Sequence, residues 1–185
     1  MYKLCKTEQS TQRQRQLEHG LLRLMLVKRY EEISISDLCE RMNIPRKSFY
    51  RYFSSKDGAL FALLDHTMLD FYESGFHTAD AETALDELEL FFVFWYRQKE
   101  LLDALQRSGL SGILVERATE LAAKERLMPK RIKSWSTDRR DLALSFALCG
   151  LMSMILHWHR QGYPVSPEEM TAVAAAMLTR PLIEL

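Results

Sequence analysis

Apolar residues recur at helical spacings on both sides of a short break in residues 34–56; they are Ile35, Leu38, Met42, Ile44, Phe49, Tyr52 and Phe53. This spacing predicts two short helices that share one small core. At the break, Asn43 tolerates the left-handed conformation of a turn. Pro45 suits the first turn of a new helix, because its missing N–H costs little there. Ser34 or Ser36 can cap the first helix. The pattern therefore predicts a helix-turn-helix.

The second of these helices, about residues 46–53, divides into an apolar and a polar side. The aromatic residues can anchor the helix to the core. The polar residues suit the major groove of DNA, where Arg or Lys pairs with the edge of guanine, and the base-reading candidates are Arg46, Lys47, Ser48 and Arg51. Candidates for phosphate contacts, which fix register without reading sequence, are Ser34, Tyr50, Tyr52 and Lys56. Short helices with exposed cations also occur in proteins that never meet nucleic acid, so the pattern alone leaves both interpretations open.

Three motifs follow one another in this stretch, namely SISDL, the turn MNIP and SFYRYFSSKDGAL. Together they resemble the TetR (Tet repressor) family of bacterial transcription regulators, strongly over residues 17–64 and only in architecture beyond. Asn43 stands where the family usually has Gly, and Pro45 where it often has Ser or Thr. Arg46 and Lys47 replace small residues at the start of the recognition helix. These two substitutions put the operator sequence beyond inference.

The resemblance implies a DNA-binding domain of three helices at residues 1–55, followed by an effector-binding and dimerisation domain at residues 56–185. It further implies a ligand-responsive regulator, most often a repressor, that acts as a homodimer on a palindromic double-stranded DNA operator. In this family the helix that begins near Lys56 transmits ligand binding to the DNA-reading heads. The identity of the small-molecule effector is not implied.

The segment 85–96 is apolar on more than one face, which is typical of a helix that is deeply buried or lines a cavity. Core packing is the default for such an aromatic run. The resemblance favours an effector cavity in this region, and its predicted ligand-binding walls are Met68, Phe71, Phe92 and Trp95.

Residues 142–158 contain no Asp, Glu, Lys or Arg. A membrane span usually needs about 20 such residues, and this run also includes Ser145, Ser153 and His157, so we expect no membrane insertion. A helix that is apolar on every side needs cover on every side, and a second copy of the chain would supply it. The last helix is announced by Ser-Pro-Glu-Glu at 166–169. We therefore predict a homodimer through the last two helices.

The composition agrees with an all-α protein of about nine helices, since the 185 residues include only 7 Gly and 5 Pro. The net charge is zero, but residues 1–60 hold 12 Lys and Arg against 7 Asp and Glu, whereas residues 61–185 hold 13 against 18. Positive potential is thus concentrated where the helix-turn-helix lies. Residues 1–9 are expected to form a frayed arm with two lysines. The basic run at 130–133 is interpreted as a solvated loop.

The three cysteines, Cys5, Cys39 and Cys149, are widely spaced and form no CxxC motif. Reduced thiols in a cytoplasmic protein are the natural interpretation, with Cys39 and Cys149 inside helical cores. The amino terminus lacks the apolar core of a secretion signal.

Two other function classes were weighed. For an enzyme, the nearest catalytic pair is His157 and His159, whose spacing of two points them to different faces of a helix; we predict no catalytic residue, no metal site and no cofactor. A TetR-like regulator controlled by a protein or peptide partner, in place of a small molecule, is the closer alternative.

Overall fold

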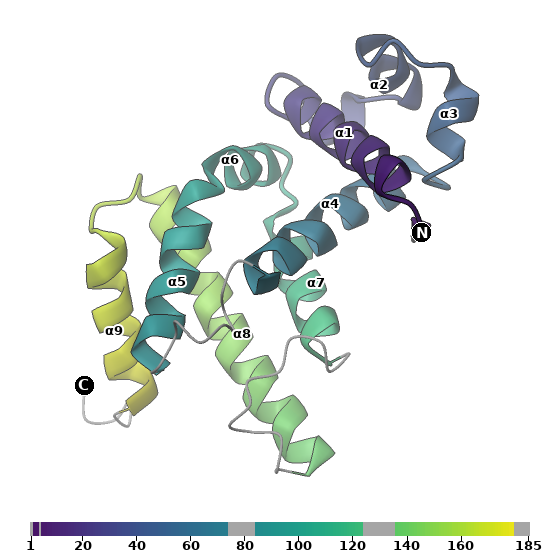
Figure 1. Cartoon of the computed structure of the whole chain (residues 1–185). Helices are drawn as coiled ribbons and strands as arrows, with labels where there is room; N and C mark the ends of the chain where they lie inside the picture. Colours follow the sequence, from purple (N-terminus) through teal and green to yellow (C-terminus); the bar gives the residue numbers. More distant parts are fainter. Residues whose placement is uncertain (1, 4, 74–83, 124–135, 180–185) are drawn as a thin grey trace. The chain divides into compact units, whose positions relative to one another are not determined.

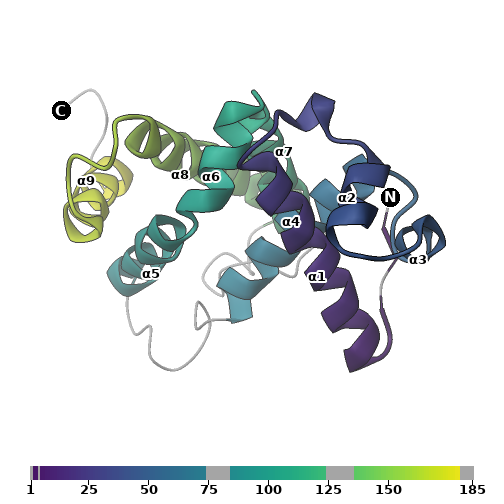
Figure 2. The same ribbon diagram turned by 90° about the horizontal axis from the view of Figure 1, so that it is seen from above.

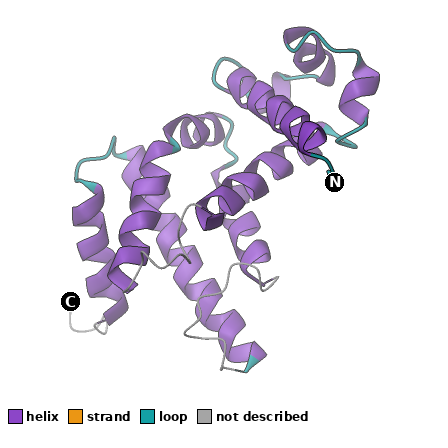
Figure 3. Ribbon diagram, in the orientation of Figure 1, coloured by secondary structure: helices purple, strands orange, loops and turns teal. Residues whose placement is uncertain are grey.

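The protein is described by a computed structural model, which covers residues 2–3, 5–73, 84–123 and 136–179. The regular structure of these residues is helical and includes no strand (Figure 3), which confirms the predicted all-α class. The helices are α1 (Glu8–Met25), the 3-10 turn η1 (Tyr30–Glu32), α2 (Ile35–Arg41), α3 (Arg46–Tyr50), α4 (Lys56–Phe71), α5 (Ala84–Arg97), α6 (Lys99–Arg107), α7 (Ser111–Ala123), α8 (Thr137–Arg160) and α9 (Pro167–Thr179). The basic run at 130–133 lies outside the described residues.

Two compact units make up the chain. The first comprises Met1–Thr67 and Glu100–Ile113, and the second comprises Met68–Lys99 and Leu114–Leu185. Helix α4 therefore contributes to both units. The functional division at residues 55 and 56 stays a prediction, because packing alone places the change of unit further along α4.

In the first unit, α1 supplies the support for the helix-turn-helix. It begins after Thr7, whose hydroxyl accepts a hydrogen bond from the Ser10 N–H at 3.3 Å. Its buried stripe is formed by Leu17, Leu21, Leu24 and Met25. Gly20 lets α2 approach closely, since a Cβ there would lie 2.6 Å from the Met42 sulfur. Figures 1 and 2 show α2 and α3 packed beside α1, as the three-helix prediction requires.

The amino-terminal arm differs from the expected frayed segment. The Lys3 N–H donates to the Tyr52 carbonyl at 3.0 Å, and the Gln14 amide donates to the Lys3 carbonyl at 3.1 Å. The Tyr2 hydroxyl donates to Asp65 at 2.7 Å. These partners lie 11 or more residues away, so no local pattern indicates that the arm is tied down.

In the second unit, α5 packs along α9, and aromatic rings join α5 to the end of α8 (Figure 1). The Trp158 ring lies 6.2 Å from Phe92, 5.5 Å from Tyr96 and 4.9 Å from Tyr163, measured between ring centroids. The Lys99 ammonium sits 3.6 Å from the centre of the Tyr96 ring. These contacts form the core around the α8–α9 connection.

Helix α8 exposes an apolar face. Leu142 and Phe146 are more than two-thirds exposed, and Cys149, expected inside a core, is also exposed. By length and composition this helix is apolar enough to cross a membrane, with a mean hydropathy of 1.5, and among the described residues it alone passes that test. Cys39, by contrast, is buried as expected, and burial raises the pKa of its thiol.

Candidate nucleic-acid interface

The first helix of the helix-turn-helix is fixed by a reciprocal cap. Ser34 precedes α2, and its hydroxyl accepts the Asp37 N–H at 3.0 Å. The Asp37 carboxylate accepts the Ser34 N–H at 2.7 Å and the Ser34 hydroxyl, and it pairs with Lys28 at 3.1 Å. The Ser34 hydrogen bonds, and then Lys28, hold the pKa of Asp37 well below its usual range. The Ser34 hydroxyl is thus engaged inside the domain, and its phosphate contact stays a prediction.

The turn between the two helices has the predicted conformation. Asn43 adopts a φ of 50°, in the left-handed region. The Ile44 N–H then returns to the Cys39 carbonyl at 2.9 Å, and Ile44 is buried. Pro45 caps α3 and accepts the Ser48 N–H at 2.8 Å. Local residue chemistry therefore sets the angle at which α3 leaves the turn.

Helix α3 presents cations on one side and aromatic anchors on the other. Phe49 is fully buried, and its ring lies 5.2 Å from that of buried Phe53. Arg46 and Lys47 are exposed at the amino end of the helix, which is the end that contacts base edges in helix-turn-helix complexes. Ser48 is half-buried. These three side chains begin the helix, so the geometry suits the base-reading role predicted for them.

The other predicted contacts lie at or beyond the carboxyl end of α3, which ends at Tyr50 and not at Phe53. Tyr50 is 45% exposed, and its hydroxyl accepts a long hydrogen bond of 3.5 Å from Arg46. Arg51 is exposed just after the helix. Tyr52 is half-buried, and its carbonyl accepts the Lys3 N–H. Arg51 and Tyr52 therefore lie apart from the leading end of the recognition helix.

Lys56 has an internal role that sequence reasoning missed. Its ammonium donates to the Tyr30 carbonyl at 2.6 Å and to the Ile33 carbonyl at 2.7 Å, and lies 4.1 Å from the Tyr30 ring centre. Lys56 thus closes the end of η1 against the start of α4. These acceptors are backbone atoms 23 and 26 residues away, so no side-chain pattern reveals them. A phosphate contact by Lys56 stays a prediction.

Tyr30 links the same junction to α6. Its backbone N–H donates to the Ser108 hydroxyl at 3.0 Å, and its own hydroxyl donates to Asp57 at 2.6 Å. Burial, followed by the hydrogen bond to Asp57, raises the pKa of Tyr30. The hydroxyl therefore stays protonated and holds the start of α4.

The known proteins that this chain matches are regulators. A sequence model described as "Bacterial regulatory proteins, tetR family" matches residues 20–63. The chain is also 36% identical over 77 residues to the HTH-type transcriptional regulator EthR of Mycolicibacterium smegmatis. On this domain, the chain belongs to the TetR family. The alignment with EthR covers 38% of this chain and about a third, 35%, of that protein.

Solved structures extend the TetR-type fold over most of the chain. The dihydroxyacetone kinase operon activator DhaS superposes with a TM-score of 0.60 at 16% identity, over 89% of this chain and 93% of its own. The fatty acid degradation regulator FadR of Bacillus halodurans gives a TM-score of 0.60 at 14% identity, over 97% and 98%. At such identities the likeness establishes the fold alone.

The predicted ligand-binding residues lie in the second unit. Met68, Phe92 and Trp95 are buried, and Phe71 is half-buried. The Phe71 ring contacts two residues of α5 that sequence reasoning missed, Phe91 at 5.7 Å and Phe94 at 5.1 Å. Phe92 instead packs on Trp158, so the four side chains do not form one wall. Their ligand-binding role stays a prediction.

The Trp95 side chain carries one unusual feature. Its indole N–H is buried and has no hydrogen-bond acceptor among the described residues. A buried donor without a partner is costly and calls for an explanation. An effector with one acceptor atom is one such explanation.

Proposed function

We propose that this TetR-family chain is a sequence-specific DNA-binding transcription regulator whose α3 enters the major groove. The carrying observation is the division of α3, where Phe49 anchors the helix while Arg46 and Lys47 stand exposed at its leading end. Arginine and lysine at that position can pair with the O6 and N7 acceptors of guanine. The charge excess of residues 1–60 supports the approach of phosphates.

The regulator acts as a homodimer through α8 and α9 on a palindromic operator. Support comes from the exposed apolar face of α8 and from an apolar groove of about 460 Å³ between α8 and α9, whose lining includes Met154, Val165, Val173 and Met177. A second copy, related by a two-fold axis, covers each such residue twice. Two heads then read two half-sites, and their contacts add.

A small apolar or aromatic molecule controls the regulator from the second unit. The buried aromatic side chains of α5 and the partnerless Trp95 N–H support such an effector. Binding changes DNA affinity only as far as the effector prefers one conformation over the other. The open α8–α9 groove equally suits a peptide, so a chain that purifies as a monomer favours control by a protein partner.

The experiment is selection of genomic fragments by the purified chain, followed by titration of the best fragment at two salt concentrations. We expect a short palindrome bound by dimers, with an affinity that falls steeply with salt. The variant R46A/K47A should lose sequence preference, because it removes the leading cations of α3. Weak wild-type binding without any preferred sequence would contradict the proposal.

A further inference from the structure

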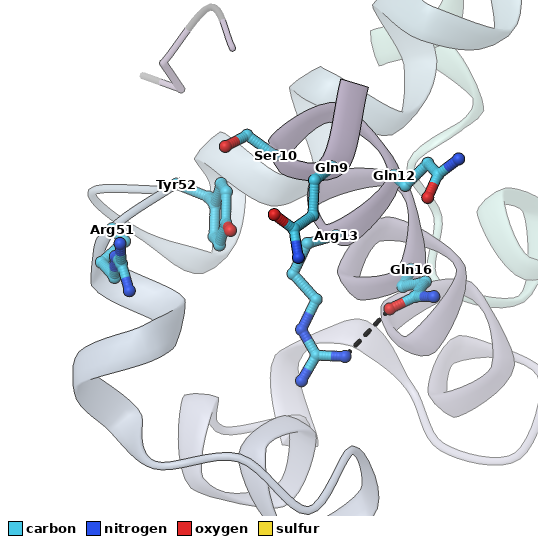
Figure 4. A pocket seen from close by; sticks show the side chains of 7 residues that line it. All are labelled: Gln9, Ser10, Gln12, Arg13, Gln16, Arg51 and Tyr52. Atoms are coloured by element: carbon cyan, nitrogen blue, oxygen red, sulfur yellow. Dashed lines mark hydrogen bonds between the residues drawn. The ribbon is translucent and has the colours of Figure 1, made fainter. Parts of the chain in front are cut away.

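A polar hollow lies between α1 and the end of α3, apart from the leading end of the recognition helix (Figure 4). It measures about 470 Å³, and we call it the α1 groove; its lining includes Gln9, Gln12, Arg13, Gln16, Arg51 and Tyr52. A second hollow of about 240 Å³ shares Arg51 and Tyr52 with it and adds Lys3 and Lys6 of the arm. All these residues belong to the first unit.

The charge of this surface is of one sign. Four cations line the two hollows, Lys3, Lys6, Arg13 and Arg51, and none of the described lining residues is acidic. Arg13 donates one hydrogen bond, at 2.9 Å, to Gln16 and keeps further N–H donors (Figure 4). Guanidinium, amide and hydroxyl groups are the donors that proteins use on phosphate oxygens.

The arm brings its lysines to the groove in an ordered form. Gln14 is buried and anchors the arm twice, since its amide donates to the Lys3 carbonyl and its oxygen accepts the Cys5 thiol at 2.9 Å. The Lys3 N–H is held by Tyr52 at 3.0 Å. The Lys3 and Lys6 side chains remain exposed. Because the backbone is already fixed, an anion that binds here need not order it.

We infer that the α1 groove binds the sugar-phosphate backbone of DNA beside the bases that α3 reads. The inference rests on the proposed function and deepens it, because it adds a contact outside the major groove. Arg51, predicted from sequence to read bases, becomes a phosphate ligand together with Arg13. The fastened arm extends the same contact along the strand.

The test compares two substitutions of equal charge on one exposed helix. R13Q removes a groove cation, and R23Q removes an exposed arginine near the other end of α1, outside the groove. Both variants should unfold at the wild-type temperature. On the selected duplex, R13Q should bind about tenfold more weakly, and its log affinity against log salt should have a slope smaller by about 0.9. R23Q should match the wild type.

Neutral phosphates locate the contact. Duplexes in which single flanking phosphates are replaced by methylphosphonates should weaken wild-type binding at one position in each half-site, and R13Q should be insensitive there. The base preference of R13Q should equal that of the wild type. Equal affinity and slope for R13Q and R23Q would overturn the inference while a preferred duplex upholds the proposed function. A wild-type chain with no preferred duplex would overturn the proposed function, and the inference with it.

Discussion

The helix pairs α2–α3 and α8–α9 treat their apolar side chains in opposite ways. In the first pair, Leu38 is 1% exposed and Phe49 is fully buried, while the exposed positions of α3 carry cations. In the second pair, Leu142 is 73% and Phe146 is 71% exposed. The helix-turn-helix thus completes its own core and offers a polar surface to a polyanion.

The α8–α9 face has the opposite character. Its exposed residues recur at helical spacing, Leu142, Phe146, Cys149, Ser153 and His157, and therefore line one side of α8. The small Ser and Cys side chains allow close approach by another helix. An apolar face of this kind is expected to be covered when the protein works. The comparison separates a domain that needs a charged partner from one that needs an apolar partner.

The largest expected effect tests that apolar partner. Phe146→Ser should leave the subunit folded, since the ring is exposed, but should weaken dimerisation. Each copy loses about 1.5–3 kcal/mol of burial, which counts twice in a two-fold interface. The dissociation constant of the dimer should rise a hundredfold or more, as measured by sedimentation equilibrium. Val27→Ser, which removes another exposed apolar residue, should change nothing. Unchanged dimers in F146S would place the interface elsewhere.

The next effect tests the self-contained core. Phe49→Ala should destabilise the first unit by about 3–5 kcal/mol, because it opens a cavity beside Phe53. Urea unfolding and DNA binding should both report the loss, whereas sedimentation should still show dimers. Tyr50→Ala is the matched control, since its ring is largely outside the core and its removal should cost under about 1 kcal/mol. Loss of dimers in F49A would show that the two regions are not independent.

The same two regions differ in how far their sequence predicts them. The Ser34 cap, the left-handed Asn43 and the Pro45 start of α3 follow from local residue chemistry, and each is found. The all-α class and the existence of both apolar helices near the carboxyl end follow from periodicity. The family motifs add the DNA-binding domain, which the comparisons confirm over residues 20–63.

Long-range backbone contacts are what the sequence does not reveal. The Lys56 ammonium binds carbonyls that any residue would supply, and the arm is held by the carbonyl of Tyr52. The Lys56 contacts bear directly on the predicted phosphate ligands, because a cation that looks free in the sequence is engaged in the fold. The pairing of Phe71 with Phe91 and Phe94 likewise depends on how α4 meets α5.

A third prediction separates a structural lysine from a DNA-reading one. Lys56→Met should destabilise the first unit by about 2 kcal/mol, because the Tyr30 and Ile33 carbonyls lose a charged donor. Lys47→Met, at an exposed position, should leave stability unchanged and weaken operator binding. Urea unfolding and fluorescence anisotropy on the same two variants give both quantities. If K56M unfolds like the wild type and lowers the salt slope, the phosphate role predicted from sequence is correct.

The smallest effect concerns the Asp37 cap at low pH. The pKa of Asp37 in the folded chain lies below its unfolded value of 3.8, so the ionised carboxylate stabilises the fold above that value. This stability is lost as pH falls below 3.8 toward the folded pKa. The difference in melting temperature between the wild type and Asp37→Asn should therefore be constant near pH 6 and shrink below pH 3.8. Glu40→Gln, an exposed acid at the other end of α2, controls for general titration. Melting curves followed by circular dichroism at both pH values decide the matter, and a wild-type-to-D37N difference that stays constant with pH would mean that the cap acts without its charge.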